Sequence, residues 1–238
     1  MLRSRAVTIA YLIAGAGSAT SRRSVRYHRD CVAATGVAHP TIAYVGAAAS
    51  DDPTFATRVA TLVFGENARV VLVDLTKRAL ETSAARARLA AADLVFFTGG
   101  DVERGMQLVD ERGLAPYIRR LAAAGKPMEG ISAGAILLGS HWIRFPERGE
   151  PERFDCLGVV PASFDTHGED DDWSELRELA RHTRDERTVF GIPSHGAASW
   201  DGTTLRALGE PLARFACGAR PRKLRGARTT RIVGRGVS

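Results

Sequence analysis

Apolar residues along the chain form short continuous runs, separated by longer stretches in which they recur at helical spacing. The runs are nearly all apolar, as parallel strands covered on both faces should be, and they lie at Val7–Ala14, Thr41–Val45, Arg69–Leu75, Asp93–Thr98 and Pro127–Ile131. Helical spacing is found at Ser21–Thr35, Asp52–Gly65, Glu81–Ala92 and Leu114–Gly125. This alternation predicts an α/β fold with a doubly wound, mostly parallel sheet flanked by helices.

The pattern changes after Gly139. The stretch His141–Arg153 is charged and contains two prolines, which predicts an exposed loop. A strand is expected at Gly158–Ser163, and an acidic cluster at Gly168–Asp172 then precedes an amphipathic stretch around Trp173–His182. The run Glu169–Asp172 is interpreted as a solvated helix N-terminus rather than as a cation site. Short additional strands are expected near the C-terminus, at Thr188–Ile192, Ala198–Trp200, Thr203–Leu208 and Leu212–Ala216. No linker divides the chain, so we expect one α/β domain at 1–218, followed by a tail at 219–238.

The composition is that of an ordinary globular protein, with 238 residues, 45% apolar and 25% charged. No apolar run approaches the roughly 18 residues of a membrane-spanning helix, so no membrane partner is expected. The three cysteines form no CxxC pair, which argues against a disulfide framework and favours a cytoplasmic location. No Cys/His cluster or HExxH motif predicts a metal site, and no complete phosphate or dinucleotide motif predicts a cofactor.

The net charge of +6 is a property of the C-terminal end. Residues 220–238 contain seven arginines and lysines and no acidic residue, which leaves about −1 for the rest of the chain. Such a segment attracts polyanions. It contains no aromatic side chain for base stacking, so we expect a solvated end rather than a nucleic-acid partner.

The clearest chemical motif is GISAG at Gly130–Gly134, between the fifth predicted strand and a helix. This spacing is typical of a nucleophile elbow, in which a serine lies on a tight turn between small residues. The following helix supplies N–H groups at its N-terminus for a developing oxyanion. The motif therefore predicts a nucleophilic role for Ser132.

A second motif, FTGGD at Phe97–Asp101, ends the fourth predicted strand. Ligands of doubly wound sheets bind at this carboxyl edge, and adjacent glycines let the backbone approach them. The N–H groups of Gly100 and Ala133 could form a two-donor oxyanion hole.

A nucleophilic serine needs a base, and the chain has six histidines. His167 follows a predicted strand and precedes a helix, which suits a base, and His195 is its competitor. Surface or packing roles are expected for His28, His39 and His182, and His141 falls in the charged loop.

At this point the chain resembles the dipeptidase E and cyanophycinase family of serine peptidases, which have a fold like class I glutamine amidotransferases. The resemblance runs from Thr8 to Phe215 and rests on FTGGD, GISAGA, FDTHG and VFGIP. It implies Ser132 as nucleophile, His167 as general base, and Gly100 and Ala133 as oxyanion donors. It also implies short peptides as substrates: dipeptidase E suggests an N-terminal aspartate, and cyanophycinase suggests aspartyl-arginine polymers.

One departure from the family pattern concerns the third catalytic residue. Relatives place an acidic residue just after the pair that Gly191-Ile192 matches, where this chain has Pro193-Ser194-His195. The sequence leaves the residue that orients His167 open among Glu147, Asp165, Asp201 and none. Loss of a third catalytic residue typically lowers the rate by about 10⁴-fold without abolishing the chemistry.

Two alternatives follow from the residues. An α/β-hydrolase would use the order Ser132, Asp165 and His195, but the chain has no HGGG-like segment upstream and the GGD motif would have no role. A non-catalytic binding module of the same fold would explain the missing acid and use the basic end for a polyanion. The sequence also leaves the oligomeric state open, a homo-oligomer included.

Overall fold

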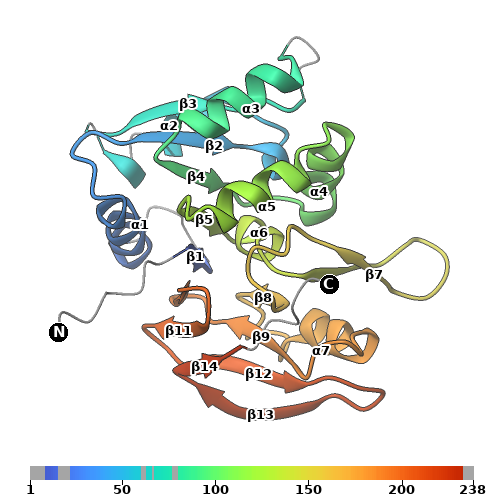
Figure 1. The fold of residues 1–238 in the computed structure, drawn as a ribbon. Coiled ribbons are helices and arrows are strands. Elements are labelled where there is room, and N and C mark those ends of the chain that lie inside the picture. Colours follow the sequence, from blue (N-terminus) through green and yellow to red (C-terminus); the bar gives the residue numbers. More distant parts are fainter. Residues whose placement is uncertain (1–8, 16–21, 60–62, 66, 77–79, 233–238) are drawn as a thin grey trace.

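The computed structural model describes residues 9–15, 22–59, 63–65, 67–76 and 80–232. Parts of the predicted first strand, first two helices and basic tail, at residues 7–8, 21, 60–62 and 233–238, lie outside these ranges. Within the described residues, the strands form sheets of eight, four and two strands (Figure 1).

The eight-stranded sheet has the order β14-β11-β10-β1-β5-β4-β2-β3. Its parallel part contains the five strands predicted from apolar runs: β1 (Ala10–Ile13), β5 (Met128–Ile131), β4 (Leu94–Phe97), β2 (Thr41–Val45) and β3 (Arg69–Leu72). Antiparallel pairings extend the sheet from β1, through β10 (Ala197–Trp200), β11 (Thr204–Leu208) and β14 (Thr229–Arg231). The predicted fold class is confirmed.

Helices cover both faces of the parallel part. Side chains alternate along β2, so that Ile42 and Tyr44 join the core under α1 (Arg22–Ala34) and α2 (Pro53–Val59), whereas Ala43 joins the opposite core. The opposite face carries α3 (Thr82–Ala91), α4 (Val102–Glu111), α5 (Ala115–Ala123) and α6 (Ala133–Leu137), and the turn η1 (Ala47–Ala49) packs on α4. Sequence patterning missed α4, which begins where Asp101 accepts a hydrogen bond from the Arg104 amide at 2.9 Å.

The four-stranded sheet has the order β13-β12-β9-β8, and α7 (Ser174–His182) packs on it, as Figure 1 shows. Its strands are β8 (Phe164–Thr166), β9 (Thr188–Ile192), β12 (Leu212–Ala216) and β13 (Arg222–Ala227). The pair β8 and β9 is parallel. Buried Trp173 precedes α7 and packs over Gly191, where a Cβ would lie 2.4 Å from the indole ring. This contact fixes the chain between β8 and α7.

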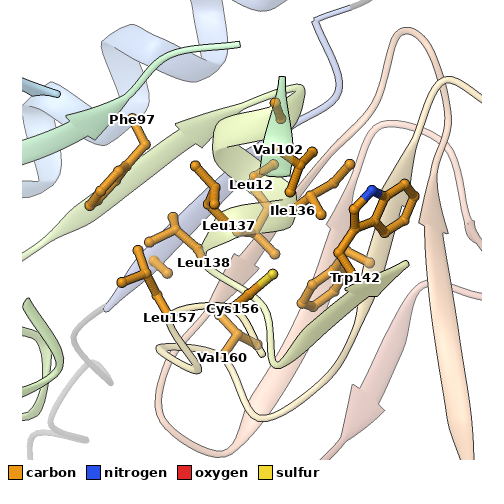
Figure 2. Packing of buried hydrophobic residues seen from close by; sticks show 14 of the residues in the cluster. Leu12, Phe97, Val102, Ile136, Leu137, Leu138, Trp142, Cys156, Leu157 and Val160 are labelled. Carbon is orange, nitrogen blue, oxygen red and sulfur yellow. The ribbon is translucent and has the colours of Figure 1, made fainter. Parts of the chain in front are cut away.

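The segment His141–Arg153, predicted as an exposed loop, forms most of a hairpin instead. Strands β6 (His141–Arg144) and β7 (Glu152–Asp155) pair with each other, and Trp142 is buried. Figure 2 shows Trp142 in one cluster with Ile136 and Leu137 of α6. The prediction of an exposed loop was wrong because it followed the charged residues of this stretch, whereas the apolar pair Trp142-Ile143 within it is buried.

The strand predicted at Gly158–Ser163 is also wrong, because regular pairing starts one residue later, at Phe164. The preceding backbone bonds to the end of α6 rather than to a sheet: the amides of Leu157 and Val160 donate to Leu137 and Leu138, both at 2.9 Å. These hydrogen bonds wrap the chain around α6.

The described part of the predicted basic tail forms strands. β13 pairs with β12, and β14 pairs with β11, so the arginine-rich end lies at the edges of both larger sheets. The boundary at residue 218 stays a prediction.

Candidate active site

Ser132 occupies a sharp bend between β5 and α6. Its backbone has φ 52° and ψ −121°, a conformation rare for residues other than glycine. Three hydrogen bonds hold the bend: the Ser132 amide donates to Ile13 at 2.9 Å, and its carbonyl accepts from Ala135 at 2.8 Å and Ile136 at 3.2 Å. The strain is thus imposed by the strand on one side and the helix on the other.

The glycines that flank this bend are required by close backbone approach. A Cβ on Gly130 would lie 2.3 Å from the carbonyl oxygen of Gly134, and a Cβ on Gly134 would lie 2.1 Å from that of Phe97. Both distances are far below contact distance. The small residues of the GISAG motif therefore let β4, β5 and α6 meet at Ser132.

His167 reaches Ser132 from the four-stranded sheet. It follows β8 directly, has φ 48°, and its amide donates to Ile192 on the adjacent strand at 3.0 Å. The Oγ of Ser132 lies 2.9 Å from Nε2 of His167. Two residues 35 positions apart in sequence, each directly after a strand of a different sheet, are thus within hydrogen-bond distance.

The Gly99-Gly100 turn after β4 lies against the same serine. A Cβ on Gly99 would lie 3.2 Å from Cβ of Ser132, and one on Gly100, with φ 140°, would lie 2.1 Å from the carbonyl oxygen of Ala48. Gly100 and Ala133 both line the cavity that contains Ser132. Within the described residues, we find no hydrogen bond from either amide to another group. Both amides can therefore serve a ligand.

The cavity around the Ser132–His167 pair has a volume of about 450 Å³ and two unlike walls. One consists of the glycine turn, the serine bend and the apolar side chains of Val102, Ile136 and Trp142. The other, formed by the segment from β8 to the first turn of α7, carries Asp165, Asp170, Asp171 and Glu175. We call these four residues the acidic wall.

None of the three acids proposed from sequence donates or accepts a hydrogen bond with His167 in the structure. Asp201 caps the β10–β11 turn, accepting from Thr204 at 2.8 Å and pairing with Arg206. Glu147 is exposed in the β6–β7 turn. Asp165 is buried, lines the same cavity as His167 and accepts from the Thr166 amide at 2.7 Å.

The sequence analysis missed Glu175. This residue lines the cavity in the first turn of α7, and burial together with the charge of Asp171 raises its pKa, while His167 lowers it. The two groups therefore interact electrostatically. The acidic run before an amphipathic helix was the available signal, and it was interpreted as a solvated helix start.

Burial raises the pKa of Asp165 from its ordinary 3.8 to about 7. The hydrogen bond from Thr166 opposes this rise, and the charges of Glu175, Asp171 and Glu169 add to it. A buried carboxyl group with a pKa near neutrality in the lining of a cavity is typical of functional sites.

The competing histidines lie elsewhere. His195 lines a separate cavity with Arg23, Arg26 and Tyr27, so the structure does not bring together the α/β-hydrolase set Ser132, Asp165 and His195.

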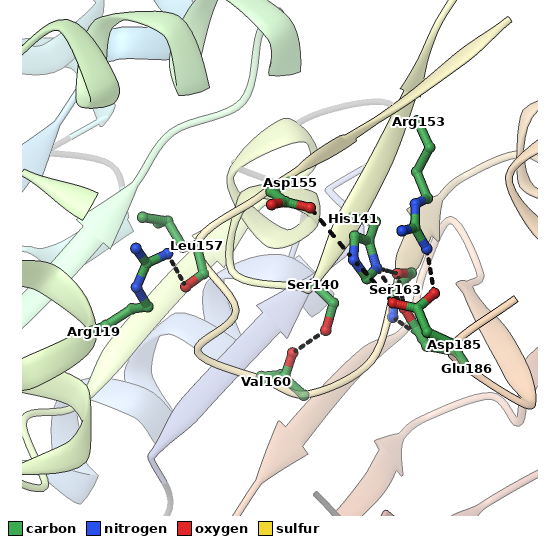
Figure 3. A network of polar contacts seen from close by, with 10 residues as sticks. All are labelled: Arg119, Ser140, His141, Arg153, Asp155, Leu157, Val160, Ser163, Asp185 and Glu186. Carbon is green, nitrogen blue, oxygen red and sulfur yellow. Dashed lines mark hydrogen bonds and ion pairs between the residues drawn. The ribbon is translucent and has the colours of Figure 1, made fainter. Parts of the chain in front are cut away.

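His141 belongs to the polar network of Figure 3, where its Nδ1 lies 2.8 Å from Glu186. The same glutamate accepts from the Ser163 amide at 2.8 Å. The network therefore joins the β6–β7 hairpin to the start of β8, the strand that carries His167.

A family model described as peptidase family S51 matches residues 11–208. The chain belongs to peptidase family S51. This confirms the resemblance to the dipeptidase E and cyanophycinase family and places the protein among peptidases.

Two curated relatives match parts of this S51 member. A cyanophycinase from Trichormus variabilis is 32% identical over 101 residues, which cover 39% of this chain and 34% of that protein. A cobyric acid synthase from Streptomyces avermitilis is 41% identical over 75 residues, 31% of this chain and 14% of that protein. The chain thus spans well under two thirds of the length of either relative.

Solved structures agree on the fold of the S51 chain. A peptidase from an acI-B1 Actinobacterium aligns with a TM-score of 0.74 and 14% identity, covering 96% of this chain and 99% of that one. A putative peptidase E protein from Listeria monocytogenes aligns with a TM-score of 0.64 and 16% identity, covering 84% and 96%. At these identities the likeness concerns the fold.

Among the described residues, no helix has the length and apolar character to cross a bilayer. In the same part of the chain, no group of three or more His, Cys, Asp and Glu side chains is placed to hold a metal ion.

Proposed function

We propose that this S51 member is a serine peptidase that hydrolyses a peptide bond in short peptides, with Ser132 as nucleophile and His167 as general base. The observation that carries the proposal is the 2.9 Å contact between Ser132 Oγ and His167 Nε2, on a strained bend that opens into a cavity. Such a pair is the minimum that acyl transfer to serine requires.

In this mechanism, Ser132 Oγ attacks the peptide carbonyl while Nε2 of His167 takes its proton. The amides of Gly100 and Ala133 donate to the oxyanion of the tetrahedral intermediate. His167 then returns the proton to the departing amine, which breaks the C–N bond and leaves an acyl group on Ser132. A water molecule, deprotonated by His167, releases the acid and restores the serine.

The proposal does not need a third residue bonded to the imidazole. When His167 becomes positively charged, Glu175 and the ionised form of Asp165 supply negative charge on the same side of the cavity. This electrostatic support takes over part of what an orienting carboxylate does elsewhere, without fixing the ring by a hydrogen bond.

The resemblance makes peptides with an N-terminal aspartate, as for dipeptidase E, the first substrates to test. Aspartyl-arginine polymers, as for cyanophycinase, come second. A cytoplasmic location is also part of the proposal. It is supported by the state of Cys31, Cys156 and Cys217, which are free thiols within the described chain.

The test is a dipeptide panel, together with labelling by a fluorophosphonate probe, on the wild type and three variants. Ser132→Ala should abolish labelling, and His167→Ala should lower kcat/KM by at least about 10⁴-fold. His195→Ala is the matched control and should retain both activities, because His195 lies in another cavity. Full labelling of His167→Ala, or hydrolysis that survives in Ser132→Ala, would overturn the assignment.

A further inference from the structure

A buried carboxylate joins the ends of two neighbouring strands at the sheet edge where Ser132 lies. Asp51 follows β2 and the turn η1, and it is 2% exposed. Its Oδ2 accepts hydrogen bonds from the amides of Leu75 and Thr76, which follow β3, at 2.8 and 3.1 Å. Burial raises the pKa of Asp51, and the hydrogen bond from Leu75 opposes this rise. Because a buried carboxylate needs such donors, its side chain fixes the chain after β2 against the chain after β3.

The backbone around Asp51 is held in an unfavourable conformation. Ser50 and Asp51 have φ of 54° and 52°, in the left-handed region that residues other than glycine seldom adopt. The Asp51 amide donates to the carbonyl of Gly46 at 2.9 Å, which closes the chain around η1. A Cβ on Gly46 would lie 2.9 Å from Oδ1 of Asp51, so the glycine makes room for the carboxylate. Strain of this kind persists only where surrounding contacts impose it, and it is concentrated at functional sites.

The turn η1 that Asp51 closes packs directly on the glycine turn of the site. The carbonyl oxygen of Ala48 accepts from the Asp101 amide at 2.9 Å. The same oxygen would lie 2.1 Å from a Cβ on Gly100, which has φ 140° and lines the cavity. The backbone of Gly100 is thus confined by η1 outside the cavity. The direction of the Gly100 amide therefore depends on the position of Ala48, and this in turn depends on how Asp51 anchors the turn.

We propose that Asp51 is a positioning residue for the oxyanion hole, which acts through Ala48 to hold the Gly100 amide toward the developing negative charge. The inference rests on the proposed serine peptidase function and adds to it a residue outside the cavity. Asp51 is not among the residues that line the cavity, so its effect has to pass through the backbone of η1. We expect this effect on the transition state, where the oxyanion forms, rather than on substrate binding.

The first test compares Asp51→Ala with Asp51→Asn on a dipeptide that the wild type hydrolyses. Alanine removes the acceptor for the Leu75 and Thr76 amides. Asparagine can offer one oxygen to both amides, because Oδ2 alone accepts both hydrogen bonds, and it tolerates a positive φ. Rates are expressed per active site, counted by labelling with the fluorophosphonate to completion. Unfolded protein is then not mistaken for slow enzyme.

We expect kcat of Asp51→Ala to fall by about 10- to 100-fold, because removal of an oxyanion donor costs about 10²–10³ and here the donor is displaced. KM should stay within about threefold, since the affected interaction is made in the transition state. Asp51→Asn should restore kcat to within about threefold of wild type, because it keeps the anchoring hydrogen bonds. An equal fall of kcat in Asp51→Asn would contradict the hydrogen-bonded anchor.

A peptide aldehyde tests the oxyanion hole itself. The Ser132 oxygen bonds to the aldehyde carbon, the serine proton passes to His167, and the π electrons of the carbonyl move to the oxygen that faces the amides of Gly100 and Ala133. The affinity for the aldehyde should fall in Asp51→Ala by about as much as kcat. The affinity for the corresponding peptide alcohol, which forms no adduct, should stay within about threefold. A merely structural role of Asp51 would change neither ratio.

Asp93 provides the matched control at the opposite end of the same strands. Its Oδ2 accepts from the amide of Thr41, the first residue of β2, at 2.8 Å. Asp93→Ala therefore removes the same kind of hydrogen bond from the edge away from the site, and it should lower Tm with kcat and aldehyde affinity unchanged. An equal loss of kcat in Asp93→Ala, or wild-type kcat and aldehyde affinity in Asp51→Ala, would overturn the inference. Should Asp51→Ala fail to fold, Asp51→Gly removes the same carboxylate and suits the positive φ.

Hydrogen exchange of the Asp101 amide tests the anchor without turnover, because this amide donates to Ala48. Its exchange should become at least about tenfold faster in Asp51→Ala and stay unchanged in Asp93→Ala. Labelled, peptide-hydrolysing protein in which neither exchange nor kcat depends on Asp51 would contradict the anchor and leave the peptidase function standing. Unlabelled, inactive wild-type protein in which the exchange still depends on Asp51 would contradict the serine mechanism and leave the anchor standing.

Discussion

The two sides of the cavity are built by opposite means. The side made by β4, β5 and α6 is defined by space: small residues let three backbone segments meet at Ser132. The side made by β8 and the start of α7 is defined by charge, with four carboxyl groups in the same cavity lining as His167. Steric requirements leave a compact motif in the sequence, whereas a charge arrangement depends on which residues the fold leaves unpaired. The proposed reaction uses Ser132 from the first side and His167 from the second.

The largest effect is expected where space defines the site. Gly134→Ala places a Cβ 2.1 Å from the carbonyl oxygen of Phe97, and backbone on both sides leaves no flexible atom to move away. We expect a loss of at least about 3 kcal/mol in the free energy of unfolding, from overpacking. We also expect at least a hundredfold loss in kcat/KM, from displacement of Ser132 by about an ångström. Denaturant unfolding and peptide hydrolysis measure the two effects.

The control for this prediction is Gly113→Ala, at a glycine with φ 58° and open space around it. Alanine there has the unfavourable backbone conformation but meets no atom, so the cost should be about 1–2 kcal/mol with unchanged activity. If Gly134→Ala behaved like this control, close packing would not be what defines the serine side.

The serine side was predictable from sequence because close backbone packing requires small residues there, as it does at Gly134. Apolar runs gave the five parallel strands, and the GGD and SAGA motifs follow two of them, so Gly100 and Ser132 had to meet at one sheet edge. The position of His167 beside Ser132 was also expected. The role of His167 as general base and the role of the Gly100 and Ala133 amides as oxyanion donors stay predictions, because geometry alone does not test a catalytic role.

The acidic side was not predictable in the same way. The partners of a charged residue are set by contacts distant in sequence: Lys223 reaches back to Asp172 only because β13 pairs with β12 beside α7. Sequence patterning therefore treated the whole acidic run as solvated. Likewise, Trp142 was assigned to a loop, because its burial depends on packing against α6 rather than on local pattern.

A second prediction concerns the cost of the acidic side to stability. The pKa of Asp165 is about 7 in the folded protein and lies near its ordinary 3.8 when unfolded. Between these values the folded state holds more protons than the unfolded state, so stability falls as pH rises through this window. Asp165→Asn removes the titration. It should raise the free energy of unfolding by about 2 kcal/mol at about pH 8, with about 4 kcal/mol as the upper limit of the shift.

The pH dependence distinguishes this cause from a general effect of the substitution. The stability gain of Asp165→Asn should shrink from about pH 8 to about pH 5, because wild-type Asp165 becomes protonated and neutral in the folded state. Glu175, Asp171, Glu169 and His167 face the same region, so the comparison has to be made within one buffer series. A pH-independent gain, or a loss of stability, would contradict the buried-charge account of this wall.

The smallest effect is expected at the paired acid just outside the cavity. Lys223→Gln removes one of the two cations on Asp172 and one of the two over Phe215, and it leaves Arg177 to satisfy both. Both partners of the Lys223–Asp172 pair are more than half exposed, so the loss of stability should be small and should disappear in about 1 M salt. Hydrolysis should stay within about twofold of wild type, because no atom of this pair lines the cavity. A loss as large as the gain in Asp165→Asn would show that the outer pair and the acidic wall act as one electrostatic unit. The cost of the wall to stability would then depend on how β13 docks beside α7.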